Sequence, residues 1–208
     1  MHPMFEQLSK MKLVPVIVIK DVEKAVPLAK ALCDGGLPCA EVTFRTACAA
    51  DAIKAITQAL PEMLVGAGTV LTPAQADEAI AAGSKFLVSP GLNPEVVKHA
   101  QSRGIPMLPG VCTPSEVELG LSLGLDTLKF FPAEAAGGVN MLKSLAGPYG
   151  NIRFMPTGGL TPNNMNDYFG LKSVFAAGGS WMVKDDLIEA GDFAKITELV
   201  KEAVALLK

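Results

Sequence analysis

The sequence predicts a single domain, residues 1–208, that folds as an α/β protein: a (β/α)8 TIM barrel of parallel strands with an N-terminal helix. Three observations support this fold: the length of the chain, its apolar composition, and a regular alternation of strand-like and helix-like segments. The 208 residues lie near the lower end of the size range of such barrels. Half of the residues are hydrophobic and only 6% are aromatic, so aliphatic side chains must fill strands that are buried on both faces.

Short apolar runs typical of buried strands recur along the whole chain. Their starts are about 20 to 26 residues apart, which is the length of one strand, one helix and two loops in a compact α/β unit. Regular alternation of strands and helices favours a parallel sheet, and eight units favour closure into a barrel. The eight predicted strands are VPVIVI (14–19), CAEVTF (39–44), LVGAGT (64–69), KFLVSP (85–90), IPMLPG (105–110), TLKFFP (127–132), RFMPTG (153–158) and SVFAAGG (173–179).

An open, doubly wound α/β sheet is the structural alternative to the barrel. That fold places a glycine-rich dinucleotide-binding turn directly after its first strand. Here the first strand is followed by IKDVEK, which contains no glycine, so the sequence favours the barrel.

Helix start and stop signals lie between these strands. Several helices are predicted to begin with a capping residue followed by proline and to end at glycine. Glu116 stands where it completes a capping box. Asp21 caps a helix that ends at Gly35–Gly36, and Pro27 is expected to shift the start of that helix or to kink it. The remaining signals are Thr72, Pro73 and Gly83; Asn93, Pro94 and Gly104; Thr113, Pro114 and Gly124; an N-terminal helix over the bottom of the barrel; and a final amphipathic helix in DFAKITELVKEAVALLK.

Composition argues against several classes of partner. The formal net charge is −3 and no long cluster of Lys and Arg is present, so no nucleic-acid partner is expected. No apolar run approaches the roughly 18 residues of a membrane span, and MHPMFEQLSKMK lacks the apolar core of a signal peptide. We therefore expect a cytoplasmic protein with no membrane partner. The four cysteines form no C-x-x-C pair and the two histidines lie far apart, so reduced thiols and no metal site are expected.

Lys129 is the strongest candidate for chemistry, because it lies within the apolar strand TLKFFP and should point into the barrel. A buried ammonium is poorly solvated, which favours the neutral amine that Schiff-base chemistry with a carbonyl substrate requires. From strand position alone, a lysine paired with a buried carboxylate for structural reasons is equally consistent with the pattern.

Glu41 and Arg45 lie on one face of the second predicted strand and at its exit. An inward glutamate can pair with the lysine or move protons beside it, and an arginine at the mouth can bind a carboxylate through two hydrogen bonds. A Glu–Lys pair that only fills the barrel, with a solvated arginine, is the structural alternative. The joint pattern of Glu41, Arg45 and Lys129 favours the functional interpretation.

Glycine-rich turns follow the last two predicted strands, in PTGG (156–159) and AGGSW (177–181). Barrels that bind phosphorylated substrates often hold the phosphate on backbone N–H groups at these positions, where glycine permits close approach. Thr161 and Pro162 then begin a helix whose N-terminus would favour an anion. Tight turns that need glycine for geometry alone are the alternative.

Together these segments resemble a known family. EVTFRT, VGAGTV, SPG, KFFPAE, PTGG and GGSW, in this order and spacing, resemble the 2-keto-3-deoxy-6-phosphogluconate (KDPG) aldolases, also called 4-hydroxy-2-oxoglutarate (KHG) aldolases, over essentially the whole chain. The resemblance implies a metal-independent class I aldolase, a carbon–carbon lyase without a cofactor that is usually a homotrimer. Its small-molecule substrate is a phosphorylated 2-keto-3-deoxy acid, cleaved to pyruvate and glyceraldehyde 3-phosphate in the Entner–Doudoroff pathway. The shorter 4-hydroxy-2-oxoglutarate, cleaved to pyruvate and glyoxylate, is implied as a further substrate.

The resemblance also assigns roles by matching motif. Lys129 would form the Schiff base and Glu41 would be the general acid and base. The pyruvyl carboxylate would be held by Arg45, Thr69 and Thr157, the pyruvate pocket would be lined by Pro90, and the phosphate would be surrounded by Gly158, Gly159, Gly178, Gly179 and Ser180.

Two other functions remain open from the sequence. One is a phosphate-binding barrel isomerase or decarboxylase in which Lys129 acts as an acid or as an ion-pair partner. The other is a non-catalytic ligand-binding or scaffold barrel, for which replacement of Lys129 would affect stability alone.

Overall fold

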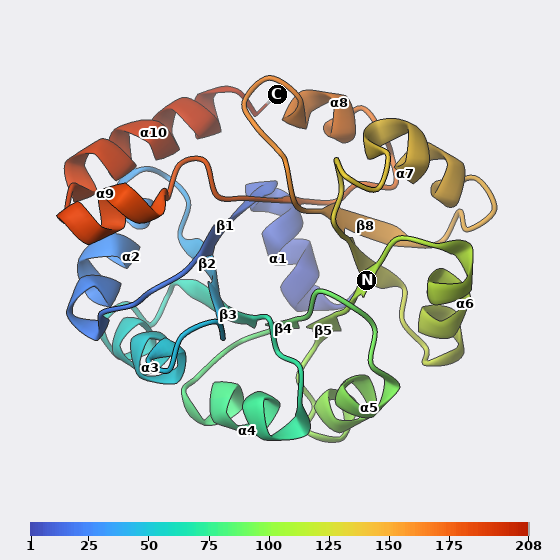
Figure 1. Cartoon of the computed structure of the whole chain (residues 1–208), viewed down its shortest axis with the longest axis horizontal. Helices are drawn as coiled ribbons and strands as arrows, with labels where there is room; N and C mark the ends of the chain where they lie inside the picture. Colours follow the sequence, from blue (N-terminus) through green and yellow to red (C-terminus); the bar gives the residue numbers. More distant parts are fainter. Residues whose placement is uncertain (208) are drawn as a thin grey trace.

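A ring of helices surrounds a central set of short parallel strands in the computed structural model, which describes residues 1–207 (Figure 1). The elements follow in the order α1 (Pro3–Met11), β1 (Leu13–Ile17), η1 (Val22–Lys24), α2 (Ala25–Asp34), β2 (Cys39–Thr43), α3 (Ala49–Ala59), β3 (Leu64–Gly68), α4 (Pro73–Ala81), β4 (Leu87–Val88), α5 (Pro94–Ser102), β5 (Met107–Leu108), β6 (Gly110–Val111), α6 (Pro114–Ser122), β7 (Thr127–Phe130), α7 (Gly138–Ala146), β8 (Arg153–Pro156), α8 (Met165–Phe169), β9 (Ala177–Gly179), α9 (Asp185–Ala190) and α10 (Phe193–Ala205).

The strands form two parallel sheets rather than the one closed eight-stranded sheet that the sequence predicted. One sheet has six strands in the order β5-β4-β3-β2-β1-β9, and the other has three in the order β6-β7-β8. The six-stranded sheet curls into a half-barrel, and the chain is therefore a parallel α/β fold in which full closure is not established.

The two seams between the sheets have identifiable causes. At one seam the predicted strand 105–110 is split into β5 and β6 by Pro109, which has no N–H to donate to a ladder. β5 pairs with β4, whereas β6 pairs with β7. At the other seam the predicted strand 173–179 is reduced to β9, and only the isolated bridges Phe154–Val174 and Thr157–Gly178 connect it to the β8 side.

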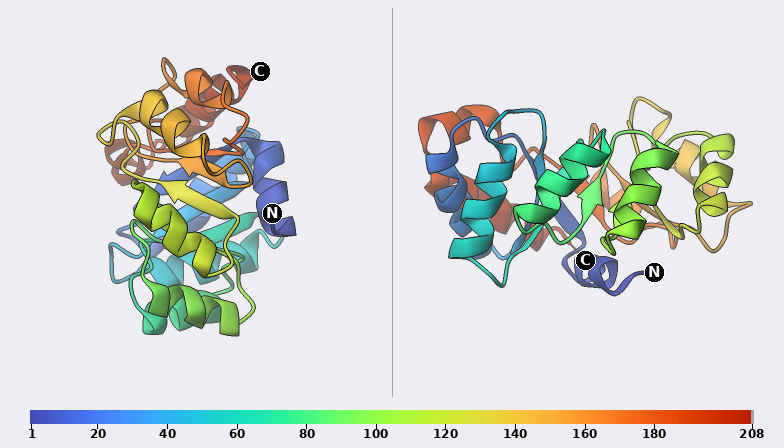
Figure 2. Two further views of the ribbon diagram at one scale, coloured as in Figure 1. Left: turned by 90° about the vertical axis from the view of Figure 1, so that its right-hand side faces the viewer. Right: turned by 90° about the horizontal axis from the view of Figure 1, so that it is seen from below.

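Helix α1 lies at one end of the strands, outside the ring formed by the other helices (Figure 2). Its side chains Phe5 and Leu8 are buried in one cluster with strand residues such as Val14 and Met155. This position agrees with the predicted N-terminal helix over the bottom of the sheet. Because that end is covered, the opposite ends of the strands carry the loops available for ligands.

The helix boundaries follow the predicted capping signals. Thr72, Asn93 and Thr113 each accept a hydrogen bond from the first turn of α4, α5 and α6, and proline occupies the first helical position in all three. Asp21 caps the short 3-10 helix η1 rather than α2 directly. Pro27 then falls in the first turn of α2, so the start of the α-helix shifts and no kink is needed.

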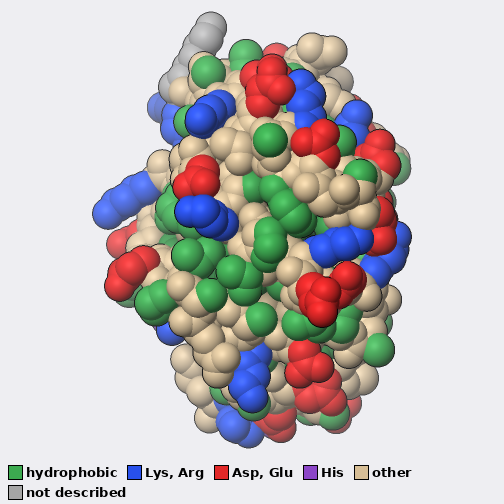
Figure 3. Space-filling model, turned by 90° about the vertical axis from the view of Figure 1, so that its left-hand side faces the viewer, with side chains coloured by type: hydrophobic (Ala, Val, Ile, Leu, Met, Phe, Trp, Pro, Cys, Tyr) green, Lys and Arg blue, Asp and Glu red, His purple; other side chains and the backbone are tan. Residues whose placement is uncertain are grey.

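Surface and thiol chemistry bear on possible partners. Figure 3 shows acidic and basic side chains interspersed on the side of the molecule where α2, α9 and α10 lie, with no extended basic region on that face. Within residues 1–207, no helix has both the length and the hydropathy that a membrane span requires. The four cysteines are free thiols, as predicted.

Glu116 should make a pH-dependent contribution to stability. Its partly buried carboxylate accepts hydrogen bonds from the N–H groups of Cys112 (2.7 Å) and Thr113 (2.8 Å). Burial alone would raise the pKa of Glu116, but these N–H groups and the Thr113 hydroxyl outweigh burial and hold the pKa below its usual value. The stabilisation is therefore present above the ordinary glutamate pKa of about 4.3 and is lost as the pH falls through the lower folded-state value.

We predict that Glu116→Ala lowers the free energy of unfolding by about 1 kcal/mol at neutral pH, a typical capping contribution for a partly exposed group. Urea denaturation of the variant and the wild type measures the difference in free energy of unfolding. This difference should shrink once the pH falls well below about 4.3, the ordinary pKa of a glutamate. A difference that is the same at neutral and strongly acidic pH would contradict the assignment.

Candidate active site

Lys129 and Glu41 form a buried ion pair inside the ring of strands. Lys129 Nζ lies 3.4 Å from Glu41 Oε1, and the two side chains are 6% and 1% exposed. Lys129 belongs to β7 and Glu41 to β2, which are in different sheets, so the pair crosses the interior of the fold. Lys129 Nζ also lies 5.1 Å from the centre of the Phe131 ring, which supplies a weak attraction for its charged form.

Small residues beside the pair leave room for it. A Cβ atom added at Gly68 would overlap the carboxylate of Glu41, so only glycine permits this path of the side chain. Gly110 pairs in register with Lys129, and a Cβ atom there would overlap the carbonyl group of Pro90. Gly68 therefore sets how closely the Glu41 carboxylate approaches the backbone of β3, and Gly110 sets how closely β6 approaches Pro90.

Two oxygen atoms at this site are buried without a hydrogen-bond partner among the described residues. They are Glu41 Oε2 and Thr157 Oγ1. A buried polar atom that lacks a partner is destabilising, and such atoms are rare in folded proteins unless a ligand or water completes them. A Cβ atom at Gly178 would overlap the hydroxyl of Thr157, so this glycine keeps the space beside the hydroxyl open. The two oxygen atoms therefore retain hydrogen-bonding capacity for a ligand or a water molecule.

A cavity of about 310 Å³ opens beside Thr157 at the carboxyl ends of β1, β8 and β9. It contains seven of the residues that the sequence predicted for substrate binding, together with five that it did not. The predicted seven are Arg45, Thr157, Gly158, Gly159, Gly178, Gly179 and Ser180; the others are Val16, Val18, Phe131, Leu160 and Asp185.

The first glycine turn at this cavity has a backbone that other residues rarely adopt. Gly158 has φ +101° and Gly159 has φ +79°. In this left-handed region a side chain is strained, so both positions favour glycine. The turn places the backbone itself, rather than side chains, on the wall of the cavity, as an anion site built from N–H groups requires.

Arg45 and Thr69 meet at the mouth of the cavity. Arg45 Nε lies 3.4 Å from Thr69 Oγ1 and donates a hydrogen bond to it. Thr69 follows β3 with φ +56°, an unusual backbone conformation for a β-branched residue. Strained backbone of this kind concentrates at functional sites, where the surrounding structure holds a side chain in a required direction.

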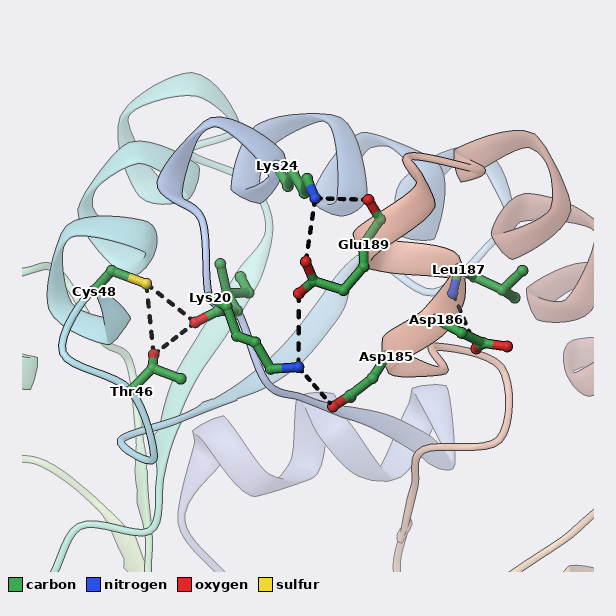
Figure 4. A network of polar contacts seen from close by, with 9 residues as sticks. Lys20, Lys24, Thr46, Cys48, Asp185, Asp186, Leu187 and Glu189 are labelled. Atoms are coloured by element: carbon green, nitrogen blue, oxygen red, sulfur yellow. Dashed lines mark hydrogen bonds and ion pairs between the residues drawn. The ribbon is translucent and has the colours of Figure 1, made fainter.

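Asp185 brings a negative charge to the cavity wall, and Lys20 balances it (Figure 4). Lys20 Nζ lies 3.4 Å from Asp185 Oδ2 and 3.7 Å from Glu189 Oε1. Lys24 holds the same helix, α9, through a hydrogen bond of 2.7 Å to the Glu189 carbonyl oxygen. Lys20 is half-exposed, so its charge lies at the surface of the molecule.

Four predicted site residues do not line this cavity: Lys129, Glu41, Thr69 and Pro90. Lys129 lies over the ring of Phe131 and Thr69 contacts Arg45, and both of these partners line the cavity. Pro90 lies apart from it. It follows β4 and lies in a shallow groove with Val70 and Leu71, although its carbonyl group packs on Gly110 beside Lys129. Phe131 was not predicted, even though it belongs to the motif KFFPAE and its spacing from Lys129 signals a shared face. Asp185 lies in a loop-to-helix segment with no motif, so no sequence signal identified it.

Comparison with known proteins identifies the family. A family model described as KDPG and KHG aldolase matches residues 4–199. The chain is 54% identical over 191 residues to the KHG/KDPG aldolase of Escherichia coli K12, covering 92% of this chain and 90% of that protein. It is 48% identical over 207 residues to the 2-dehydro-3-deoxy-phosphogluconate aldolase of Treponema pallidum, covering 100% and 99%.

A solved structure shows the same fold. The KDPG aldolase of Legionella pneumophila, with pyruvate captured as a covalent carbinolamine intermediate, matches with a TM-score of 0.93 and 42% identity, covering 96% of this chain and 97% of that one. The agreement of fold, site and sequence over nearly the whole length leads to one conclusion: this chain belongs to the KDPG and KHG aldolase family.

Proposed function

We propose that this chain is a class I aldolase that cleaves 2-keto-3-deoxy-6-phosphogluconate to pyruvate and glyceraldehyde 3-phosphate through a Schiff base on Lys129. The observation that carries the proposal is the buried Lys129–Glu41 pair beside a cavity with two glycine turns, in a chain of this family. The reaction is a step of the Entner–Doudoroff pathway. We include 4-hydroxy-2-oxoglutarate as a second substrate, because the similar Escherichia coli protein carries both activities in its name.

The reaction begins when the neutral amine of Lys129 attacks the C2 ketone. Glu41 Oε1 lies 3.4 Å from the Lys129 nitrogen. Glu41 Oε2 has no hydrogen-bond partner among the described residues. The carboxylate can therefore take the proton from the amine and deliver a proton to the departing hydroxide of the carbinolamine.

After the dehydration Glu41 is again a carboxylate, and it takes the proton of the C4 hydroxyl. At the same time the cationic imine draws the electron pair of the C3–C4 bond, so that bond breaks and the aldehyde leaves. The enamine that remains is protonated at C3, with Glu41 as the nearest acid, and water then hydrolyses the imine to release pyruvate. Lys129 thereby supplies the electron sink, and its burial keeps bulk water from the reacting atoms.

Substrate binding divides between two ends of the site. Arg45, Thr69 and Thr157 would hold the pyruvyl carboxylate, with Pro90 behind the pyruvate pocket. Arg45 and Thr69 already contact each other at the mouth, and the Thr157 hydroxyl is buried without a partner within residues 1–207. The phosphate would lie against Gly158, Gly159, Gly178, Gly179 and Ser180, all of which line the cavity.

Three wider expectations accompany this function. The two sheets would act as one (β/α)8 barrel, since the bridge Thr157–Gly178 and the bond from the Lys129 N–H to the Pro109 carbonyl span the seams. The chain would assemble as a homotrimer and work in the cytoplasm. Sedimentation of the purified protein tests the assembly.

Borohydride reduction in the presence of pyruvate tests the proposed function directly. We expect the wild-type chain to gain a stable adduct of pyruvate mass on the peptide that contains Lys129, and Lys129→Ala to gain none. Lys129 supplies the buried primary amine of this site, and such an amine forms an imine with a carbonyl substrate. Turnover by the wild type with no adduct at Lys129 would instead favour a mechanism in which this lysine acts as an acid.

Glu41→Gln should separate binding from turnover. The substitution keeps the shape of the side chain but removes its ability to accept a proton, so we expect turnover to fall by about 10²–10⁴-fold. Saturation binding of pyruvate should persist. Steady-state and single-turnover kinetics measure the change, and a rate within a few-fold of the wild type would remove Glu41 from the proton transfers.

Asp185 should weaken binding of the phosphate end. A phosphate monoester carries about −1.5 to −2 charges at neutral pH, so a carboxylate on the cavity wall repels it, and the nearby Lys20 offsets only part of that repulsion. We predict that Asp185→Asn lowers KM for the phosphorylated substrate by about two- to fivefold, with the larger effect at low salt, and that Lys20→Met raises it.

The KM for 4-hydroxy-2-oxoglutarate, which has no phosphate, serves as the internal control and should change little in both variants. Parallel kcat/KM measurements on the two substrates also establish which one the enzyme prefers. Equal changes for both substrates would show that Asp185 acts on the fold rather than on the phosphate.

A further inference from the structure

The loop between β7 and α7 packs directly on the first glycine turn of the cavity. The Glu134 N–H donates to the carbonyl oxygen of Gly158 at 3.1 Å, and the Ala133 N–H donates to that of Thr157 at 2.8 Å. From the other side, Asn164 Nδ2 donates to the Gly159 carbonyl oxygen at 3.1 Å. Both glycine carbonyls are therefore held on protein donors.

The amide of Gly159 is left for another partner. Within residues 1–207 no acceptor of the protein lies in hydrogen-bond range of this N–H group. Because both carbonyl oxygens of the turn are turned toward protein donors, an anion in the cavity meets less negative charge from the backbone. The turn is a preformed donor only as long as its peptide planes stay in this orientation.

The side chain of Glu134 supports that orientation through its stem. A Cβ atom added at Gly159 would lie 2.7 Å from both Cβ and Cγ of Glu134, so these methylene groups lie flat on the glycine. The carboxylate continues away from the turn to Gly138, the first residue of α7, where the helix N-terminus favours a negative charge.

Tyr168 of α8 fixes the far end of the Glu134 side chain. The tyrosine is fully buried, and its hydroxyl donates a short hydrogen bond to Glu134 Oε1. The pKa of Tyr168 is raised, mainly by burial and further by the hydrogen bond to Glu134 and the negative charge of that residue. The hydroxyl therefore stays protonated and remains a donor. Tyr168 of α8 therefore holds the Glu134 side chain, and Glu134 in turn contacts the backbone of Gly158 and Gly159.

We propose that Glu134, anchored by Tyr168, is a positioning residue that holds the Gly158–Gly159 turn in the conformation that binds the phosphate of the substrate. The inference rests on the proposed function only in taking this turn as the phosphate site. It assigns no contact between Glu134 and the substrate. It requires instead that loss of the stem or of the anchor weakens anion binding and leaves imine formation at Lys129 intact.

Trp181 provides a readout that does not depend on catalysis. It is the only tryptophan in the chain, and its ring packs against Gly179 on the cavity wall. Titration with inorganic phosphate, followed by Trp181 fluorescence, should therefore report occupation of the site. We expect Glu134→Ala to raise the Kd for inorganic phosphate by about tenfold, and Tyr168→Phe to raise it several-fold, because either change frees the turn.

Glu134→Gln is the conservative rescue. It keeps the methylene stem on Gly159 and a carbonyl oxygen that accepts from Tyr168, so its Kd for phosphate should stay within about twofold of the wild type. Glu118→Ala is the matched control, because Tyr149 donates to Glu118 Oε1 at 3.1 Å in a second Tyr–Glu pair away from the cavity. This control should leave phosphate affinity unchanged.

Kinetics supply the second readout. In Glu134→Ala, KM for the phosphorylated substrate should rise about tenfold, while KM for 4-hydroxy-2-oxoglutarate and the rate of borohydride trapping with pyruvate stay within about twofold. An unchanged phosphate Kd in both Glu134→Ala and Tyr168→Phe would overturn the inference, and so would equal losses on both substrates. If Glu134→Ala does not fold, Tyr168→Phe decides the result alone.

The two proposals can fail independently. A wild-type protein that forms no pyruvate adduct but loses phosphate affinity in Glu134→Ala would contradict the aldolase and support the positioning role. An active aldolase whose phosphate affinity is unchanged in Glu134→Ala and Tyr168→Phe would support the proposed function and contradict the positioning role.

Discussion

The buried pair of Lys129 and Glu41 is the constraint on which the rest of the site depends. Two charges taken out of water are stable only when each compensates the other, and removal of one partner from such a pair typically destabilises a protein by about 3–5 kcal/mol. The two residues come from strands of different sheets, so their contact at 3.4 Å also sets the distance across the interior. The pair therefore connects the two sheets across the interior of the fold.

Space for the pair is provided by glycine rather than by cavities. Gly68 admits the carboxylate of Glu41, Gly110 brings the strand beside Lys129 close to Pro90, and Gly178 lets its backbone lie directly against the hydroxyl of Thr157. These glycines weaken strand formation, since glycine has no side chain to pack. The seam at Pro109 likewise lies beside the pair, where a residue without an N–H group interrupts the strand.

The sequence was informative where the signal is local. Capping residues and prolines located the starts of α4, α5 and α6, and apolar runs located every strand to within a few residues. Lys129 and Glu41 could be recognised because a charged side chain in an apolar strand has few explanations. Strand position left their role undecided, and only the combined motifs of the family pointed to an aldolase.

Features that depend on contacts distant in the sequence were not predictable in this way. The split at Pro109 depends on which neighbouring strand each half pairs with. The run IPMLPG alone does not show these partners, so it predicts a single strand. Asp185 reaches the cavity because α9 folds back over the exit of β1, where Asp185 forms an ion pair with Lys20. Pro90 belongs to the family motif SPG but lies outside the cavity, since the direction of a loop is set by packing rather than by sequence order.

The two ends of the proposed site illustrate different ways of handling charge. At the deep end a single lysine would have to become neutral to react, and it lies buried beside one carboxylate that could exchange its proton. At the open end a dianion would be bound by backbone N–H groups of glycine turns, whose donors need no mobile side chain to be ordered. Such a set of N–H donors binds an anion well only when its peptide planes are held in a fixed orientation. The hydrogen bonds from Glu134 and Asn164 to the glycine carbonyls therefore matter to binding as much as the residues that line the cavity.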